Sequence, residues 1–256
     1  MRRWLPPIAI AAALVGLWQL AADLDVIARA LHIEPFLVPS PSEIAQSLWA
    51  DRSLLADNAW VTLQEVLAGF ALSVVAGVAF AVALHLSPAL RRAFYPLLVA
   101  SQTIPIVVVA PILVVWFGFG IGPKLAIIAL ICFFPITVNT LDGLRSVDTD
   151  LIKMMRTLDA GRWQVLRRVE CPTALPYFFS GAKIAVAVAV IGAVFGEWAG
   201  SSSGLGHLIQ QASAQLETAR TFAAVVVLSA LAILLFGLLG VVERRVAWWG
   251  PRGERA

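Results

Sequence analysis

The residue types with the clearest chemical potential lie between Gly200 and His207. The stretch Gly200–Gly204 reads Gly-Ser-Ser-Ser-Gly and fits G-x-S-x-G, the pattern around the nucleophilic serine of many hydrolases. That pattern works at a sharp strand-to-helix turn, with a positioned histidine and an acid. Here it lies between two apolar runs of helical character, and His207 follows on the same loop. We interpret the stretch as a flexible Ser/Gly hinge.

The other reactive side chains do not form a pattern that indicates a reaction. The three histidines are isolated in the sequence, and neither Cys132 nor Cys171 has a CxxC partner. The phosphate-binding pattern G-x-x-x-x-G-K-[ST] does not occur. We therefore expect no enzyme activity, no metal site and no cofactor in this chain.

The composition is that of a membrane protein. The 256 residues are 60% hydrophobic and 14% charged, with a mean hydropathy of +0.85, whereas soluble domains are about half apolar and a quarter charged. The net charge of +3 is small, and no run of lysine and arginine resembles a nucleic-acid patch. We therefore expect the chain to lie in a lipid bilayer and not to bind nucleic acid.

Six apolar stretches approach the length of about 20 residues that crosses a bilayer. If the N-terminus is cytoplasmic, 14 of the 19 lysines and arginines fall in cytoplasmic segments, four fall outside and Lys183 falls within a span. The positive-inside rule then predicts both termini in the cytoplasm. The stretches are Leu5–Leu24, Val61–Leu86, Ala93–Phe117, Leu125–Leu141, Tyr177–Ala199 and Thr221–Val242.

Two short helices are predicted on the outer side. Ser40 and Glu43 form a capping-box pattern, which predicts a helix over residues 43–50. Apolar residues at helical spacing follow Gly204–Gly206, which predicts an interfacial or re-entrant helix before the last span.

The segment Leu151–Pro176 carries seven charged residues among 26, although its flanks are almost uncharged. Asp148 is placed to cap a helix at its start. Asp159–Gly161 then interrupts the pattern, and Pro172 and Pro176 are predicted to end a second helix. The first helix has an apolar face made of Leu151, Met154, Met155 and Leu158. Such a segment either docks on a partner or lies on the membrane surface with its arginines against anionic lipid.

The spacing of this segment resembles the cytoplasmic loop of ABC-importer permeases. In that loop E-A-A is followed by three residues, a glycine, nine residues and I-x-L-P. Here Lys153-Met154-Met155 stand at E-A-A, Asp159 stands at the glycine, and Val169–Pro172 stand at I-x-L-P. The spacing is complete, although most of the motif residues are replaced. We expect Gly161 to supply the backbone freedom of the replaced glycine.

The resemblance extends over nearly the whole chain, to the nitrate/sulfonate/taurine-type permeases. It implies an all-α membrane protein with six transmembrane helices of the type I ABC importer permease kind. It also implies one permease domain over residues 1–256, with a core over 58–247 and a cytoplasmic coupling loop over 142–175. The further stretches that carry it are Phe36–Pro41, Trp116–Gly120, Phe133–Pro135 with Asn139-Thr140, and Gly204–Gly206.

The resemblance implies partners and a location in the inner (plasma) membrane. The partners are cytoplasmic ABC ATPase subunits that bind ATP and magnesium, an extracytoplasmic solute-binding protein, and a second permease chain, expected to be a copy of this one. ATP hydrolysis then belongs to the separate ATPase. The residues implied in coupling are Lys153, Met154, Met155, Arg156, Thr157, Leu158, Asp159, Ala160 and Gly161.

The solute is less determined by the sequence than the machinery. Ser101–Pro105 and Gly192–Glu197 resemble permeases for thiamine-precursor pyrimidines or riboflavin, which favours a neutral heterocycle. Sulfonate, taurine or nitrate remains an alternative, as does an ion-coupled secondary transporter with ionisable groups in its spans. The polar residues expected along the path are Gln102, Thr103, Asn139, Glu197 and Trp198.

Overall fold

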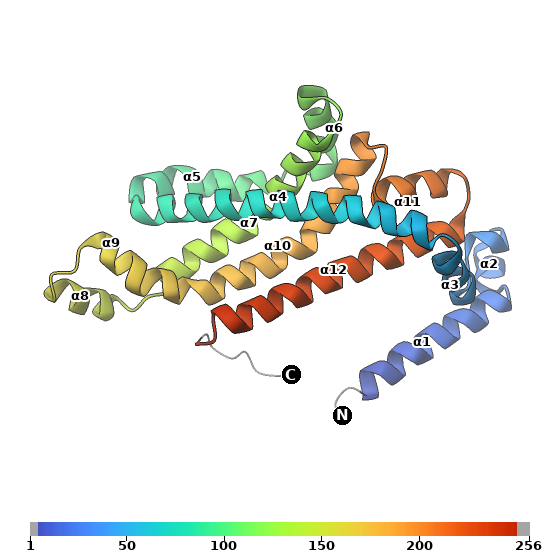
Figure 1. Ribbon diagram of the computed structural model, residues 1–256, viewed down its shortest axis with the longest axis horizontal. Coiled ribbons are helices and arrows are strands. Elements are labelled where there is room, and N and C mark those ends of the chain that lie inside the picture. The colour runs from blue at the N-terminus through green and yellow to red at the C-terminus, as the bar shows by residue number, and fades with distance from the viewer. Residues whose placement is uncertain (1–4, 250–256) are drawn as a thin grey trace. The chain divides into compact units, whose positions relative to one another are not determined.

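A computed structural model describes residues 5–249, and every regular element among them is helical (Figure 1). The all-α prediction is therefore confirmed. The elements are α1 (Leu5–Asp23), α2 (Val26–Leu31), η1 (Pro35–Leu37), α3 (Pro41–Ala50), α4 (Arg52–Leu86), α5 (Pro88–Ser101), α6 (Ile106–Phe117), α7 (Ile121–Arg145), α8 (Thr149–Thr157), α9 (Arg162–Val165), the π turn η2 (Leu166–Glu170), α10 (Cys171–Gly200), α11 (Leu205–Ala214) and α12 (Thr218–Val246).

Among residues 5–249, four helices are long and apolar enough to cross a membrane. The third predicted stretch is not one straight helix, because α5 and α6 meet at an angle of 102°. Pro105 lies at this break, and a proline disfavours helical geometry in the residue before it. The first stretch is a shorter apolar helix, Ala9–Asp23. The four helices are α4, α7, the continuous helix Arg162–Gly200 and α12, and the bent pair α5–α6 would make a fifth span. The predicted count of six spans is thus inexact.

The second helix of the charged segment does not end at Pro172 and Pro176, contrary to the prediction. It continues through η2 into α10. Pro172 is the second residue of α10, which directly follows the π turn η2, where the helix already departs from the regular i→i−4 pattern. Pro176 has no N–H for the carbonyl of Pro172, but the indole Nε1 of Trp249 donates to that oxygen at 3.2 Å.

The described chain divides into two compact units, residues up to 61 with 202–230, and residues 62–201 with those from 231 onward. In the first unit, Ser40 and Glu43 form the predicted capping box, with Glu43 N donating to Ser40 Oγ and Ser40 N to Glu43 Oε2. The predicted helix after Gly204 is α11. The existence of both short helices is confirmed. The core of this unit contains Ile44, Leu55, Leu205, Leu208, Ala223 and Ala224.

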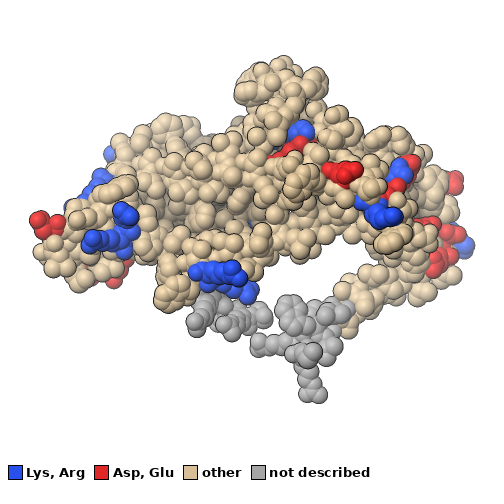
Figure 2. Space-filling model, in the orientation of Figure 1, with Lys and Arg blue, Asp and Glu red and all other residues tan. Residues whose placement is uncertain are grey.

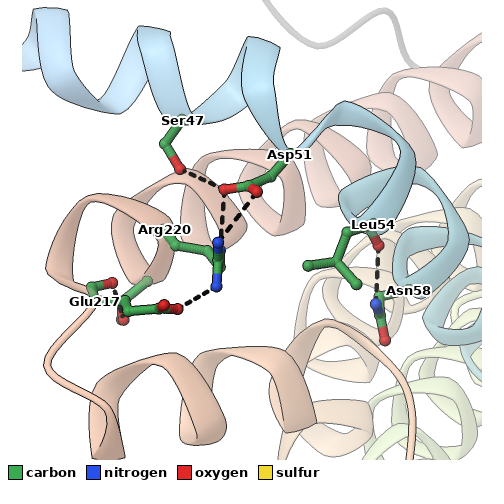
Figure 3. Close-up of polar contacts among 7 residues, drawn as sticks. Ser47, Asp51, Leu54, Asn58, Glu217 and Arg220 are labelled. Atoms are coloured by element: carbon green, nitrogen blue, oxygen red, sulfur yellow. Dashed lines mark hydrogen bonds and ion pairs between the residues drawn. The ribbon is translucent and has the colours of Figure 1, made fainter.

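A polar cluster in the first unit joins the end of α3 to the start of α12 (Figure 3). Arg220 donates to both carboxylate oxygens of Asp51, at 2.9 and 3.2 Å, and also pairs with Glu217. Ser47 Oγ donates to Asp51 at 3.1 Å. The Arg220 hydrogen bond keeps the pKa of Asp51 below its ordinary value. Asp51 is therefore negatively charged at neutral pH, and its ion pair with Arg220 is maintained there.

The second unit is built on close packing of α7 against α10, which glycines allow. A Cβ added to Gly181 would lie 2.5 Å from the carbonyl oxygen of Pro135 and 2.7 Å from Cβ of Asn139. A Cβ at Gly143 would lie 2.8 Å from Cα of Ala174. Small residues let membrane helices approach in this way. This packing holds Asn139 of α7 against α10. It also positions the end of α7, after which the charged segment begins.

Candidate functional site

Helix α8 is amphipathic and has no buried residue. Asp148 caps it, accepting from Asp150 N at 2.8 Å, as predicted. Its apolar side stays open, since Leu151, Met154 and Leu158 are 39%, 53% and 72% exposed, while Met155 is half-buried. An apolar helical face left uncovered at the end of a protein indicates a binding surface.

A tight turn ends α8 at Asp159, which has φ 58° and lies in the left-handed region. Ala160 N donates to Met155 O at 3.1 Å and Asp159 N donates to Arg156 O at 3.0 Å. This is the hydrogen-bond pattern of a Schellman turn, in which glycine usually occupies the left-handed position. Asp159 thus does the work of the replaced glycine. The expectation for Gly161 is wrong, because its φ of −65° and ψ of 160° suit any residue.

Changing Asp159 tests this turn. Asp159→Gly is expected to stabilise it by a few tenths to about 1 kcal/mol, because glycine has no Cβ penalty there, and Asp159→Val is expected to destabilise it. Amide hydrogen exchange over residues 158–160 measures both effects. Gly161→Ala is the matched control, because a Cβ at Gly161 meets no atom within 4 Å. Faster exchange in Asp159→Gly than in the natural chain would contradict the assignment.

The second half of the segment is seated on its own unit. Val165, Leu166 and Glu170 are buried, and Glu170 Oε2 lies 3.0 Å from His85 Nε2 on α4. Arg162 donates to the carbonyl of Leu86, the last residue of α4. The segment is therefore divided: α8 is open, and α9 with η2 is fixed.

Basic side chains gather at this end of the second unit, where α8 and α9 lie (Figure 2). The concentration agrees with the asymmetry seen in the sequence. The basic residues of α8, α9 and η2 are Lys153, Arg156, Arg162, Arg167 and Arg168.

A pocket of about 700 Å³ opens at the break between α5 and α6. Its polar lining residues are Ser101, Gln102 and Asn139, and none of its lining residues is ionisable. Asn139 donates its side-chain N–H to Pro135 O at 2.8 Å, which leaves its amide oxygen as an acceptor. The apolar lining residues are Ile104, Pro105, Ile106, Val109, Leu130, Ile131, Phe134, Pro135, Val138, Ile184, Val188 and Ile191.

The residues predicted along a path are only partly brought together. Gln102 and Asn139 line the pocket, whereas Thr103, Glu197 and Trp198 do not. The hydroxyl of Thr103 donates to Ala100 O at 2.8 Å, and the Trp198 ring packs edge-on against Phe195. Glu197 is fully buried. The sequence did not separate pocket residues from packing residues, because both are polar residues within apolar runs.

A buried charged cluster in the second unit was missed by the sequence reasoning. Lys124 Nζ lies 2.6 Å from Glu65 Oε1 and 2.6 Å from Ser201 Oγ. Glu197 Oε1 accepts from Thr62 Oγ1 at 2.6 Å. Lys124 is the only lysine or arginine between residues 92 and 145, which is the signal that could have found it. Within residues 5–249, no group of three or more His, Cys, Asp or Glu side chains is arranged to hold a metal ion.

Comparison with known proteins gives a family match and near-full-length relatives. The family model described as "Binding-protein-dependent transport system inner membrane component" matches residues 73–248. A formylaminopyrimidine transport permease of Halalkalibacterium halodurans is 38% identical over 92% of this chain and 92% of its own length. A riboflavin transport system permease of Chloroflexus aurantiacus is 38% identical, over 84% and 81%. A taurine transport system permease of Escherichia coli is 30% identical, over 93% and 87%.

A solved structure shares the fold. A chain of the inward-facing MetNI methionine ABC transporter superposes with a TM-score of 0.66 at 22% identity, over 76% of this chain and 97% of that chain.

Proposed function

Because the chain belongs to the family of binding-protein-dependent transport system inner membrane components, and is thus the permease subunit of an ABC importer, we propose how it couples and what it carries. In this proposal α8 couples the membrane helices to a separate ATPase, and the pocket beside Asn139 lies on the path of a small neutral heterocycle. The observation that carries the proposal is α8 itself, an amphipathic helix without a buried residue.

The open face of α8 supports the coupling role. Met154 and Leu158 offer an adaptable apolar surface, because methionine side chains fit irregular grooves. Lys153 and Arg156 are exposed on the same short helix and suit acidic groups at the rim of a groove, where they orient a partner more than they hold it. The proposed contact runs from Lys153 to Gly161, and the partner carries the ATP and magnesium.

The family and the charge pattern support a proposed assembly. We place two copies of this permease with two ATPase chains, and an extracytoplasmic binding protein on the opposite side. The basic residues near α8 support a cytoplasmic location for that end, because cytoplasmic segments of inner-membrane proteins carry the excess of lysine and arginine. Both termini then lie in the cytoplasm and the whole chain acts as one permease domain.

The pocket supports a neutral solute with hydrogen-bond donors. It has no ionisable lining residue, so nothing in it compensates the charge of a sulfonate or nitrate. The free amide oxygen of Asn139 accepts from an N–H or O–H of the solute. Two relatives at 38% identity are named for formylaminopyrimidine and riboflavin, both heterocycles.

One observation favours a second solute class. The taurine transport permease is 30% identical over 93% of this chain, so the same machinery serving a sulfonate is the alternative. In that case the binding protein alone would select the anion.

Reconstituted vesicles test the proposal. The purified chain alone is expected to show no ATP hydrolysis, and vesicles that also contain its ATPase and binding protein are expected to take up labelled formylaminopyrimidine or riboflavin only with ATP. Uptake of taurine instead would support the alternative solute. Uptake driven by a proton gradient, by the chain without any ATPase, would overturn the importer mechanism in favour of a secondary transporter.

A further inference from the structure

The coupling segment joins α10 through a π turn. In η2 the N–H of Cys171 donates to the carbonyl of Leu166, five residues earlier. Such turns inside helices are rare and occur frequently at functional sites. Glu170 is the last residue of η2 and is buried, although it follows two exposed arginines. The π turn is therefore where the segment turns a charged side chain inward.

The partner of Glu170 is His85, in the last turn of α4. The two side chains are 11% and 15% exposed, and their polar atoms lie 3.0 Å apart. The ring Nδ1 of His85 is buried and has no hydrogen-bond partner in the described part of the chain. Since a carboxylate only accepts, Nε2 of His85 donates to Glu170. This bond is thus the ring's one polar anchor among the described residues.

Two further contacts fix the same half of the segment to α4. Arg162 donates to the carbonyl of Leu86 at the C-terminus of α4, where a cation also interacts favourably with the helix dipole. Leu166 is buried with Leu144 and Ala174, and Val82 and Leu86 pack against this cluster. A hydrogen-bonded pair, a helix-end cap and an apolar contact therefore act at one place.

These contacts fix one half of the coupling segment, whereas the other half, α8, is open to a partner. Helix α8 has no buried residue, and it reaches the fixed half through the turn at Asp159. The fixed half continues directly into α10 and is bonded to α4. If a partner displaces α8, the movement is therefore transmitted to both α4 and α10.

We infer that His85, Glu170 and Arg162 form an inner joint that makes α4 and α10 move as one body when α8 is displaced. His85 and Glu170 are positioning residues in this role, since they act on the spans and not on a solute. The inference rests on the proposed function, because it takes α8 to be the place where the ATPase acts.

The test measures the distance between α4 and α10 in the complete complex with its ATPase. Spin labels are attached through Val75→Cys on α4 and Ala187→Cys on α10, which are both exposed and lie outside the pocket lining, with the exposed Cys171 changed to Ser. Labelled chain is diluted with unlabelled chain so that each labelled pair lies within one chain. In the chain that keeps His85, the distance is expected to be the same without nucleotide and with ATP trapped by vanadate.

His85→Ala is expected to shift or broaden that distance by roughly 2 Å or more on trapping, the scale of helix shifts in switching proteins. His85→Gln, which keeps a donor, is expected to restore a single distance. Thr173→Val is the matched control, since it removes only the Thr173–Val169 hydrogen bond in the next turn. Loss of folded protein in His85→Ala is tested by its melting temperature, and Glu170→Gln, which keeps an acceptor, provides a second, milder variant.

The outcomes separate the two claims. An unchanged distance on trapping in His85→Ala, with the ATPase still bound, would overturn the inner joint and leave the proposed function standing. Failure of the ATPase to bind the unaltered chain would overturn the proposed function and the joint together.

Discussion

Replacing Leu158 by Asp is expected to abolish co-purification of the ATPase with this permease. Leu158 is 72% exposed at the end of α8, and docking would desolvate it. An aspartate there would bury a charge without a prepared partner. Loss of a central interface residue costs about 2–4 kcal/mol, which is roughly a 30- to 1,000-fold weaker complex. Met155→Asp is expected to act in the same direction. Affinity pull-down from detergent extracts measures both.

The control variant makes the same leucine-to-aspartate substitution at a position outside the coupling segment. Leu90→Asp puts the same charge at an apolar position that is 42% exposed in the first turn of α5, outside the coupling segment. It is expected to leave the ATPase bound. Membrane insertion of Leu158→Asp should be normal, because its spans are unchanged. If Leu158→Asp and Met155→Asp both retained the ATPase and uptake, the segment would be only a membrane-surface loop.

The second large effect is expected at the buried cluster of the second unit. Lys124→Met would leave the carboxylate of Glu65 without its cation, with side chains that are only 9% and 4% exposed in the pair. Removing one partner of a buried ion pair costs about 3–5 kcal/mol. We expect a much lower melting temperature in detergent and a lower yield of folded protein. Thermal unfolding followed by size-exclusion chromatography measures this loss.

Two variants make the test specific. The double change Lys124→Met with Glu65→Gln is expected to recover much of the stability, because the uncompensated charge is gone. Lys183→Met is the matched control, since its ion pair with Glu243 is less buried, with side chains that are 27% and 23% exposed, and a smaller loss of stability is expected. A double variant no more stable than Lys124→Met, or an equal loss in Lys183→Met, would contradict the account of the cluster.

Features set by neighbouring residues could be predicted from the sequence. The capping box at Ser40, the cap at Asp148 and the amphipathic face of α8 each depend on residues within a few positions of one another. The same holds for the helix after Gly204. For this reason the positions of α3 and α8 agree with the predictions to within two residues, and α11 begins directly after Gly204.

Features set by distant residues could not be predicted. His85 meets Glu170 across 85 positions, and Lys124 meets Glu65 across 59. No local pattern indicates which residue is the partner in either pair. The proline rule also failed in one direction: Pro105 breaks a helix, whereas Pro176 does not, because Trp249 satisfies the carbonyl that Pro176 leaves unbonded. The pocket depends on the bend between α5 and α6. Only the three-dimensional structure could therefore show that Asn139 lines the pocket and Glu197 does not.

Photo-cross-linking from α8 tests the central claim, that this helix is the contact to the ATPase, most directly. A photoreactive amino acid is placed at Met154, which is 53% exposed, in cells that express the whole importer, and the cross-linked species are identified by mass spectrometry. The account predicts a cross-link between residue 154 and the ATPase subunit, and none when the reactive residue is placed at Leu90. Cross-links from residue 154 to lipid alone, with the ATPase present in the same membranes, would contradict it.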